Sequence, residues 1–362
     1  MHKHNSFFDA YFCPLLNHDI YMQRCLWLAA LGAGYTAPNP LVGAVLVYRD
    51  RIIGEGYHRK YGEAHAEVNC ISSVKAADQP LIAQSRLYVS LEPCSHYGKT
   101  PPCTGLILSQ KIPEVIIATT DPFAAVNGSG IARLRQAGVR VITGILEKEA
   151  QWQNRRFFTF QQLQRPYVIL KWAQTADGYT GNRDTTRRLL ISDAISNRLV
   201  HRWRSEEAAI LVGTNTALAD NPRLTNRLWT GPQPLRMVTD LSLRLPGNLH
   251  LFDKTIPTVI FNNLKEEREE NLQYVKIAPG LAVLPAILEW SYQNGVQSIL
   301  VEGGARLLQS FINIDCWDEA RVITNPRLRT EEGIAAPQLG ATVKAVTLQP
   351  GGDNIDIYFK QH

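Results

Sequence analysis

Four residues suited to a metal site stand in two short segments of the first half of the chain. His65-Ala66-Glu67 supplies an imidazole and a carboxylate, and a later segment supplies the thiols of Cys94 and Cys103. One imidazole, two thiolates and one carboxylate form the set that a catalytic zinc needs when water occupies its fourth position. If they act together, the four residues must meet in one pocket, which constrains how this half of the chain folds.

The spacing of His65 and Glu67 predicts where a helix begins. In a continuous helix, residues two positions apart point about 200° away from each other, so these side chains could not share a pocket from its middle. We therefore expect the helix to begin at the motif. Cys94 follows a strand and Cys103 opens a helix, whose N-terminal end favours a thiolate. Two thiolates leave the zinc less able to acidify its water, so Glu67 is the expected base.

Other uses of these residues stay open. A structural zinc site usually has four protein ligands, and Cys70 could supply a fourth in principle, although its place one turn along the helix favours packing. His-x-Glu alone is common on helix surfaces, and two cysteines separated by eight residues could be two buried thiols. Their combination, in order with Glu92-Pro93-Cys94, favours a catalytic site.

The length and composition of the chain restrict its class. At 362 residues it exceeds what one hydrophobic core usually organises, which predicts two domains. Six scattered cysteines are too few for a disulfide framework, and reduced thiols suit a cytoplasmic enzyme. The net charge of +5 comes without a run of Lys or Arg, and no window reaches the roughly 18 apolar residues of a membrane span. We expect small-molecule partners, neither nucleic acid nor membrane, and a homo-oligomer.

The first half alternates strands and helices. After an N-terminal extension of residues 1–17, a helix is expected from Asp19 to about Ala33, and later helices begin near Ala64, after Pro102 and at Ile131. The expected strands cover residues 42–47, 52–56, 87–91, 115–119 and 139–142. This order predicts an α/β fold for residues 18–146, with helices covering a mixed sheet that starts with an antiparallel hairpin.

The alternation of strands and helices ends before residues 147–166, which are expected to form a partly helical linker. Residues 167–362 then predict a second α/β domain with a mainly parallel, three-layer sheet. Its expected strands cover residues 167–171, 209–212, 235–239, 258–261 and 298–301, and its helices cover 193–203 and 281–292. Glu302-Gly303-Gly304-Ala305 follows a strand and opens a helix, so its amides could receive a pyrophosphate or could form only a tight turn.

The zinc motif resembles that of the nucleobase deaminases, which carry a His-x-Glu and Pro-Cys-x-x-Cys signature. Here the cysteine segment is longer, Cys-Ser-His-Tyr-Gly-Lys-Thr-Pro-Pro-Cys, and is similar to that of one family, the bifunctional riboflavin-biosynthesis deaminase–reductases. Pro-Asn-Pro-Leu-Val-Gly at 38–43 and Gly-Glu-Gly-Tyr-His at 54–58 support the resemblance, which extends from His18 onward. It implies a three-layer, cytidine-deaminase-like first domain and a dihydrofolate-reductase-like second domain, with zinc and NADPH as cofactors.

The resemblance also implies roles for residues of the first domain. The zinc ligands would be His65, Cys94 and Cys103, and Glu67 would carry protons during hydrolytic deamination of 2,5-diamino-6-(5-phosphoribosylamino)pyrimidin-4(3H)-one. The residues expected to contact this substrate are Asn39, His58, His96 and Lys99. Phe123 stands where the family usually has an asparagine, which leaves the pose of the substrate open.

The second half resembles the reductase of the same family, which reduces the ribosyl group to ribityl. The resemblance rests on Lys171, Asp177-Gly178, residues 213–225 and residues 301–304. NADPH would contact Ala173, Thr216, Asp220, Gly304, Ala305 and Arg306. The ribosyl phosphate substrate would contact Lys171, Arg204, Leu224, Arg227 and Glu302. Arginine suits phosphate because its planar guanidinium gives paired, charge-assisted hydrogen bonds.

Two segments depart from the family's reductase pattern. Residues 185–190 read Thr-Thr-Arg-Arg-Leu-Leu where Gly-Glu-Ser-x-Trp is common, and Asp240-Leu241-Ser242 stands where Asp-Ser is common. Ser242 and Arg244 are candidates to bind the NADPH 2′-phosphate. Three alternatives therefore stay open: a chain active only as a deaminase, a nucleoside or tRNA deaminase with an accessory domain, and a non-catalytic, zinc-stabilised assembly module.

Overall fold

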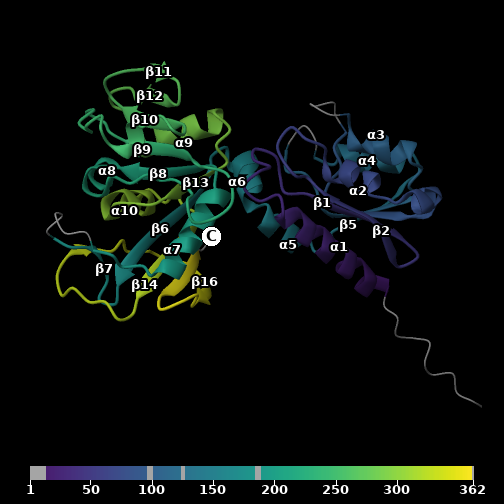
Figure 1. Cartoon of the computed structure of the whole chain (residues 1–362). Helices are drawn as coiled ribbons and strands as arrows, with labels where there is room; N and C mark the ends of the chain where they lie inside the picture. Colours follow the sequence, from purple (N-terminus) through teal and green to yellow (C-terminus); the bar gives the residue numbers. More distant parts are fainter. Residues whose placement is uncertain (1–13, 96–100, 124–126, 184–188, 361–362) are drawn as a thin grey trace, which may run out of the picture. The chain divides into compact units, whose positions relative to one another are not determined.

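The computed structural model describes residues 14–95, 101–123, 127–183 and 189–360. The chain divides into two compact units, Met1–Gln162 and Leu163–His362 (Figure 1). Each unit has its own sheet and its own hydrophobic clusters, so each is described by itself. Among the described residues, no helix combines the length and the apolar character that a membrane crossing requires.

The first unit is built on a five-stranded sheet in the order β2-β1-β3-β4-β5. β1 and β2 form an antiparallel hairpin, whose turn places Arg49 and Asp50 at φ angles of 46° and 60°. β1 is also antiparallel to β3, whereas β3, β4 and β5 are parallel. The mixed sheet predicted from the sequence is confirmed. Its strands are β1 (Gly43–Tyr48), β2 (Arg51–Tyr57), β3 (Arg86–Leu91), β4 (Glu114–Thr119) and β5 (Arg140–Thr143).

Helices cover both faces of this sheet and give the unit three layers. On one face, Met22 of α1 and Ala150 of α5 pack against Tyr88. On the other face, Cys70 of α2, Ile107 of α3 and Leu134 of α4 belong to one buried cluster. The helices up to residue 163 are α1 (Pro14–Ala30), α2 (Ala66–Ser72), the 3-10 helix η1 (Ala76–Gln84), α3 (Cys103–Ser109), α4 (Ser129–Gln136), α5 (Glu147–Gln153) and α6 (Arg155–Leu163).

The first helix differs from its expected bounds. It begins at Pro14 and not at Asp19. Proline is favoured at the first position of a helix, since the N–H that it lacks would have no partner within the helix there. Residues 14–17, which the sequence placed in an extension, therefore belong to α1. The helix ends at Ala30, before the expected Ala33. Residues 1–13 lie outside the described residues.

Residues 147–166, expected to be a partly helical linker, contain the whole of α5 and α6. Asn154 joins these helices to the loop before β1, because its side chain accepts from the N–H of Leu41 and donates to the carbonyl of Leu41, both at 2.8 Å. Gln153 donates to the carbonyl of Leu26 at 2.8 Å. These bonds hold α5 and the start of α6 on the first unit.

The second unit has a ten-stranded sheet in the order β11-β12-β10-β9-β8-β13-β6-β14-β17-β16. All neighbouring strands from β12 to β14 are parallel. At the two sides of the sheet, β11 is antiparallel to β12, β17 to β14, and β16 to β17. This confirms the mainly parallel sheet. The strands of this unit are β6 (Tyr167–Thr175), β7 (Tyr179–Gly181), β8 (Ala209–Gly213), β9 (Leu235–Thr239), β10 (Thr258–Asn262), β11 (Glu267–Glu269), β12 (Leu272–Lys276), β13 (Ser298–Val301), β14 (Glu319–Asn325), β15 (Ile334–Ala335), β16 (Thr342–Leu348) and β17 (Asn354–Lys360).

Helices also cover both faces of the second sheet. Ile169 of β6 packs with α7, and the next residue, Leu170, lies in the cluster of α9 and α10, because successive side chains of a strand alternate between faces. α7 begins after Asp193, whose carboxylate accepts the N–H of Ser196 at 2.7 Å, as a helix cap requires. The helices are α7 (Ala194–Glu206), α8 (Thr214–Asp220), the 3-10 helix η2 (His250–Phe252), α9 (Val283–Gln293) and α10 (Ala305–Asn313).

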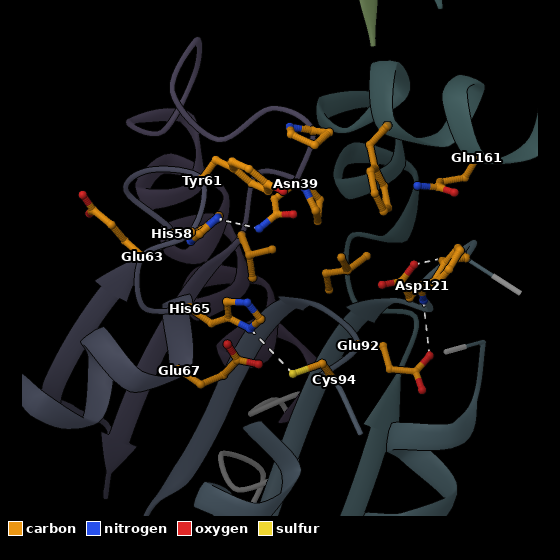
Figure 2. A pocket seen from close by; sticks show the side chains of 17 residues that line it. Asn39, His58, Tyr61, Glu63, His65, Glu67, Glu92, Cys94, Asp121 and Gln161 are labelled. Carbon is orange, nitrogen blue, oxygen red and sulfur yellow. Dashed lines mark hydrogen bonds between the residues drawn. The ribbon is translucent and has the colours of Figure 1, made fainter. Parts of the chain in front are cut away.

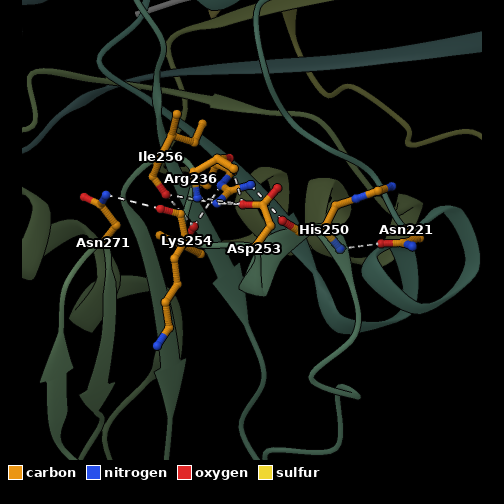
Figure 3. Close-up of polar contacts among 9 residues, drawn as sticks. Asn221, Arg236, His250, Asp253, Lys254, Ile256 and Asn271 are labelled. Carbon is orange, nitrogen blue, oxygen red and sulfur yellow. Dashed lines mark hydrogen bonds and ion pairs between the residues drawn. The ribbon is translucent and has the colours of Figure 1, made fainter.

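Arg236, near the start of β9, is fully buried and ties a loop to the sheet (Figure 3). Its guanidinium donates to the hydroxyl of Thr258, to the carbonyls of His250 and Ile256, and to the carboxylate of Asp253, at 2.8 to 2.9 Å. A buried guanidinium is tolerated only when its N–H groups find such partners. The residue therefore fixes the course of the chain between η2 and β10.

Candidate active sites

The side chains of His65, Cys94 and Cys103 meet at one point of the first unit; Figure 2 shows two of them. The Nδ1 atom of His65 lies 3.6 Å from the Cys94 sulfur and 3.4 Å from the Cys103 sulfur. A tetrahedral zinc with ordinary Zn–N and Zn–S bonds separates such ligand atoms by about 3.5 Å. The three donor atoms therefore fit a zinc ion.

The local folding explains this convergence. His65 is the N-cap of α2 with an extended backbone, φ −71° and ψ 167°, so the helix starts at Ala66 and Glu67 lies in its first turn. This confirms that the helix begins at the motif. Cys94 follows the end of β3, and Cys103 is the first residue of α3. The backbone N–H of Cys103 donates to the Cys94 sulfur at 3.3 Å, which joins the two segments.

The electrostatics of the site suit proton transfer. Glu67 is only 3% exposed, and burial raises the pKa of its carboxyl. A carboxyl with a raised pKa can both take up and release a proton closer to neutral pH. The hydrogen bond from Cys103 lowers the pKa of the Cys94 thiol, which favours its thiolate form.

A cavity of about 380 Å³ opens beside these residues, within the size range of small-molecule sites. Figure 2 shows several polar side chains around it, among them Asn39, His58 and Asp121. Its lining comes from the loops before β1 and α2, the ends of β3 and β4, and helix α6. The lining residues are Pro38, Asn39, Pro40, Val42, His58, Tyr61, Gly62, Glu63, His65, Glu67, Leu91, Glu92, Cys94, Asp121, Phe123, Phe157 and Gln161.

His58 and Asn39 form a pair at the cavity wall. The Nδ1 atom of His58 lies 3.1 Å from the carbonyl of Ala64, so Nδ1 carries the proton and Nε2 accepts from the Asn39 amide, also at 3.1 Å. Burial lowers the pKa of His58, which favours this neutral ring. The amide of Asn39 is thereby oriented with its nitrogen toward His58, and its carbonyl oxygen is the group left for a ligand.

Glu92 has a role that sequence reasoning missed. Its carboxylate accepts four backbone N–H groups, from Asp121 and Gly128 on one oxygen and from Gly130 and Ile131 on the other, at 2.8 to 3.2 Å. It thereby connects the end of β3 with the start of α4. The signal was its place in the Glu-Pro-Cys segment immediately before the predicted ligand Cys94.

Other expected and unexpected residues complete the first site. Phe123, which replaces the family's asparagine, does line the cavity. His96 and Lys99, expected to contact substrate, lie outside the described residues. Sequence reasoning missed Tyr61, Phe157 and Gln161, the last two because they come from the segment assigned to the linker.

The second unit brings together Lys171, Arg204 and Glu302. Arg204 donates to both carboxylate oxygens of Glu302 at 2.6 and 2.7 Å, and the Lys171 nitrogen lies 3.7 Å from that carboxylate. Burial alone would raise the pKa of Glu302, but the charges of Arg204 and Lys171 lower it to about 2. Two cations and one anion leave a positive charge, which suits an anionic ligand.

The segment from Leu224 to Arg227 lies against this group. The guanidinium of Arg204 donates to the carbonyl of Thr225 at 3.1 Å, and that of Arg227 donates to the Thr225 hydroxyl at 2.8 Å. The predicted substrate residues Arg204 and Arg227 are thus joined through one residue. His201 also contacts this segment, and sequence reasoning gave it no role.

A glycine cradle stands at the carboxyl end of β13. Gly303 and Gly304 have φ angles of 155° and 39°, and a Cβ atom on Gly304 would lie 2.9 Å from the hydroxyl of Thr216. The backbone therefore approaches α8 as only glycine allows, and the N–H groups that open α10 fit a pyrophosphate such as that of NADPH.

The other residues predicted to contact the cofactor lie on several elements of the second unit. Ala305 and Arg306 form the first turn of α10, Ala173 lies on β6, and Asp220 is the last residue of α8. Arg244 donates to the Asn215 side chain at 2.9 Å near the start of α8. Residues 185–188 of the altered segment lie outside the described residues.

Comparisons with known proteins match each half of the chain to a protein family. The family model of the cytidine and deoxycytidylate deaminase zinc-binding region matches residues 16–119, and that of the RibD C-terminal domain matches residues 166–344. The riboflavin biosynthesis protein RibD of Aquifex aeolicus is 36% identical over 354 residues, which cover 94% of this chain and 98% of the relative. That of Bacillus amyloliquefaciens is 40% identical over 335 residues, which cover 89% of this chain and 87% of the relative.

A solved structure extends this likeness to three dimensions. It is the diaminohydroxyphosphoribosylaminopyrimidine deaminase/5-amino-6-(5-phosphoribosylamino)uracil reductase of Thermotoga maritima, with a TM-score of 0.87 and 32% identity. The match covers 96% of this chain and 99% of that one. The chain belongs to the RibD family of bifunctional riboflavin biosynthesis proteins.

Proposed function

We propose that the chain catalyses two successive reactions of riboflavin biosynthesis. The first removes an amine from 2,5-diamino-6-(5-phosphoribosylamino)pyrimidin-4(3H)-one, and the second reduces the ribosyl group of the resulting uracil to ribityl. The Thermotoga maritima protein is named for both activities, and the likeness spans nearly the whole chain. The observation that carries the proposal is the meeting of His65, Cys94 and Cys103 beside the buried Glu67.

We assign deamination to residues 18–146 and reduction to residues 167–362, with residues 147–166 between them. The family models support this assignment, since the zinc-binding region matches residues 16–119 and the RibD C-terminal domain matches residues 166–344. The glycine cradle and the cluster of Lys171, Arg204 and Glu302 both lie in the second segment.

In the deaminase, His65, Cys94 and Cys103 would hold zinc, which when bound supplies a Lewis acid that makes water more acidic. Glu67 takes one proton from the attacking water and passes it to the ring nitrogen of the pyrimidine. It then takes the second proton of that water from the hydroxyl formed on the ring carbon and delivers it to the departing amine, which leaves as ammonia while the carbonyl forms. Its buried carboxyl has the raised pKa that this exchange needs. His58 orients Asn39 toward the pyrimidine. We assign the sugar phosphate to His96 and Lys99.

In the reductase, NADPH supplies a hydride when bound. The first turn of α10, with Gly304, Ala305 and Arg306, would receive its pyrophosphate, while Thr216, Ala173 and Asp220 contact the rest of the cofactor. These assignments rest on the cradle between Gly304 and Thr216 and on the general affinity of helix N-termini for phosphate.

The ribosyl phosphate would lie against Arg204, Leu224, Arg227 and Glu302. Lys171 is the candidate proton donor, because the sugar oxygen must gain a proton when hydride reaches the ribosyl carbon. Burial lowers the pKa of Lys171, which makes its ammonium a better acid.

Small molecules are the ligands of both sites. We further propose that the protein is a homo-oligomer, because Val343, Val346 and Leu348 are exposed on the edge strand β16 of the large sheet. Sedimentation velocity of the purified chain measures this state. The free thiols of the described cysteines support a reducing compartment such as the cytoplasm.

The test of the proposed function is the replacement Glu67→Gln in the full chain. We expect ammonia release to fall by about 10²- to 10⁴-fold, the usual size of general acid–base catalysis, with zinc content unchanged. NADPH oxidation with 5-amino-6-(5-phosphoribosylamino)uracil should persist, and Glu149→Gln, at an exposed site on α5, should leave both activities intact. Unchanged ammonia release in Glu67→Gln would remove the proposed proton carrier. A wild-type chain that oxidises no NADPH would be a deaminase alone.

A further inference from the structure

His201 lies on the same face of α7 as Arg204, three residues earlier, and is 5% exposed. Its Nδ1 atom accepts the backbone N–H of Arg227 at 2.8 Å. The guanidinium of Arg204 donates to the carbonyl of Thr225 at 3.1 Å. Two side chains of one helix therefore hold the segment from Leu224 to Arg227, one as an acceptor and the other as a donor.

This segment needs such support because it lacks regular structure. Residues 221–227 belong to no helix or strand. Leu224 is buried at a φ angle of 51°, which costs free energy for a residue other than glycine and persists only where the surroundings impose it. The direction of the exposed Arg227 side chain thus depends on how its own backbone is held.

The ring of His201 must be neutral to do this. Only an unprotonated Nδ1 atom can accept an N–H, so the proton of the ring is on Nε2. Burial, followed by the charges of Arg204, Arg227 and Lys171, lowers the pKa of His201 to about 4 against the opposite effect of Glu302. The bond to Arg227 is therefore intact at neutral pH.

We propose that His201 is a positioning residue of the reductase site. It fixes the backbone of Arg227 so that the guanidinium faces the phosphate of the ribosyl substrate. The inference rests on the proposed reductase function and concerns no contact of His201 with the reacting atoms. It assigns to His201 an effect on substrate affinity that an ordinary core residue would not have.

The test compares His201→Leu, which removes the acceptor, with His201→Asn, whose side-chain oxygen can take the place of Nδ1. In the full chain, the rate of NADPH oxidation is measured while the concentration of 5-amino-6-(5-phosphoribosylamino)uracil is varied, and again while that of NADPH is varied. We expect His201→Leu to raise the substrate KM about tenfold, the effect of one lost hydrogen bond, with the NADPH KM within about twofold of wild type. His201→Asn should recover most of the substrate affinity.

Two controls belong to the same experiment. Ammonia release by the other unit of the same chain should be unchanged in both variants. His250→Asn, a histidine replacement elsewhere in the second unit, should leave all reductase constants unchanged. In addition, nitrogen NMR of the imidazoles should show the Nε2–H tautomer for His201 between pH 6 and 8.

The outcomes separate the inference from the function on which it rests. An unchanged substrate KM in His201→Leu overturns the inference alone. Equal losses in both His201 variants, with a lower kcat and a lower Tm and without rescue by asparagine, would make the residue purely structural and also overturn it. A wild-type chain that oxidises no NADPH removes the reductase proposal, and the inference with it.

Discussion

The sulfur of Cys103 lies 3.4 Å from the Nδ1 atom of His65, although 38 positions separate them in the chain. β3 runs beside β1 in the sheet, and the segments that follow β2 and β3 carry His65 and Cys94. Both thiols and the imidazole are presented by the first or flanking residues of helices and strands, which are among the more rigid parts of a fold.

The first prediction concerns the metal. Cys103→Ser should reduce bound zinc to well below one per chain and abolish measurable ammonia release, because serine is a poor zinc ligand beside one remaining thiolate. NADPH oxidation by the second unit should persist. The control is Cys70→Ala, a buried thiol of the same unit that lies outside the cluster. Zinc is measured by atomic absorption, and full zinc in Cys103→Ser would contradict the assignment.

The bond between Asn39 and His58 gives the second prediction. Asn39→Asp keeps the size of the side chain but replaces its amide donor by a charged acceptor, so His58 must either move its proton to Nε2 and lose its bond to the carbonyl of Ala64 or become charged in a buried place. We expect kcat/KM for ammonia release to fall at least about tenfold, as expected for disruption of one buried hydrogen bond, with zinc retained. An unchanged value would show that the orientation of Asn39 does not matter.

The third prediction tests Glu92 as an anchor. Glu92→Gln retains one acceptor oxygen but turns an N–H group toward two of the four backbone N–H groups that the carboxylate accepts. We expect the free energy of unfolding of the first unit to fall by about 2 kcal/mol, the cost of buried donors left without an acceptor. Calorimetric unfolding of the full chain measures it, with the exposed Glu149→Gln as the control. Equal stability of the two variants would contradict the anchoring role.

The sequence could predict the zinc cluster because its chemistry is carried by residue type and its geometry by helix phase. His65 and Glu67 can share a pocket only at a helix start, and the structure has α2 begin between them. The residues of the reductase site could be predicted only from the resemblance to a family. Lys171, Arg204 and Glu302 follow no local rule, and only resemblance to a family connected them before the fold brought them together.

Other features depend on packing between distant segments. In the sequence, His201 is one of several polar residues of an amphipathic helix, and nothing there indicates its hydrogen bond to Arg227. Strand β14 escaped notice because two of its inward positions are charged: Glu319 and Arg321 are both buried and bond each other at 2.6 Å. A strand buried on both faces of a sheet is recognised by a continuous apolar run, and the two charged residues of this ion pair interrupt that run.

The fourth prediction concerns the buried guanidinium of Arg236. Arg236→Met keeps most of the apolar stem but removes the donor to the carbonyl of His250 and the cation beside the carboxylate of Asp253, which keeps only its bonds from Thr255. We expect the second unit to lose about 2 kcal/mol of stability, within the cost of a buried polar group left without its partner. The exposed Arg268→Met on β11 is the control. Urea unfolding compares the variants, and equal midpoints would show that the buried bonds contribute nothing.

The last prediction is a pH dependence at Glu302. The charges of Arg204 and Lys171 overcome the effect of burial and lower the pKa of its carboxyl from 4.5 to about 2. Between these values the unfolded chain binds more protons than the folded one, so the stability that Glu302 contributes is complete above pH 4.5 and is lost as the pH falls toward 2. Glu302→Gln resembles the protonated carboxyl and cannot titrate. The difference in stability between wild type and Glu302→Gln should therefore be largest at pH 7 and shrink below pH 4.5. Calorimetry of the second unit's unfolding measures it, and a difference that stays constant from pH 7 to the acid limit of folding would contradict the ion cluster.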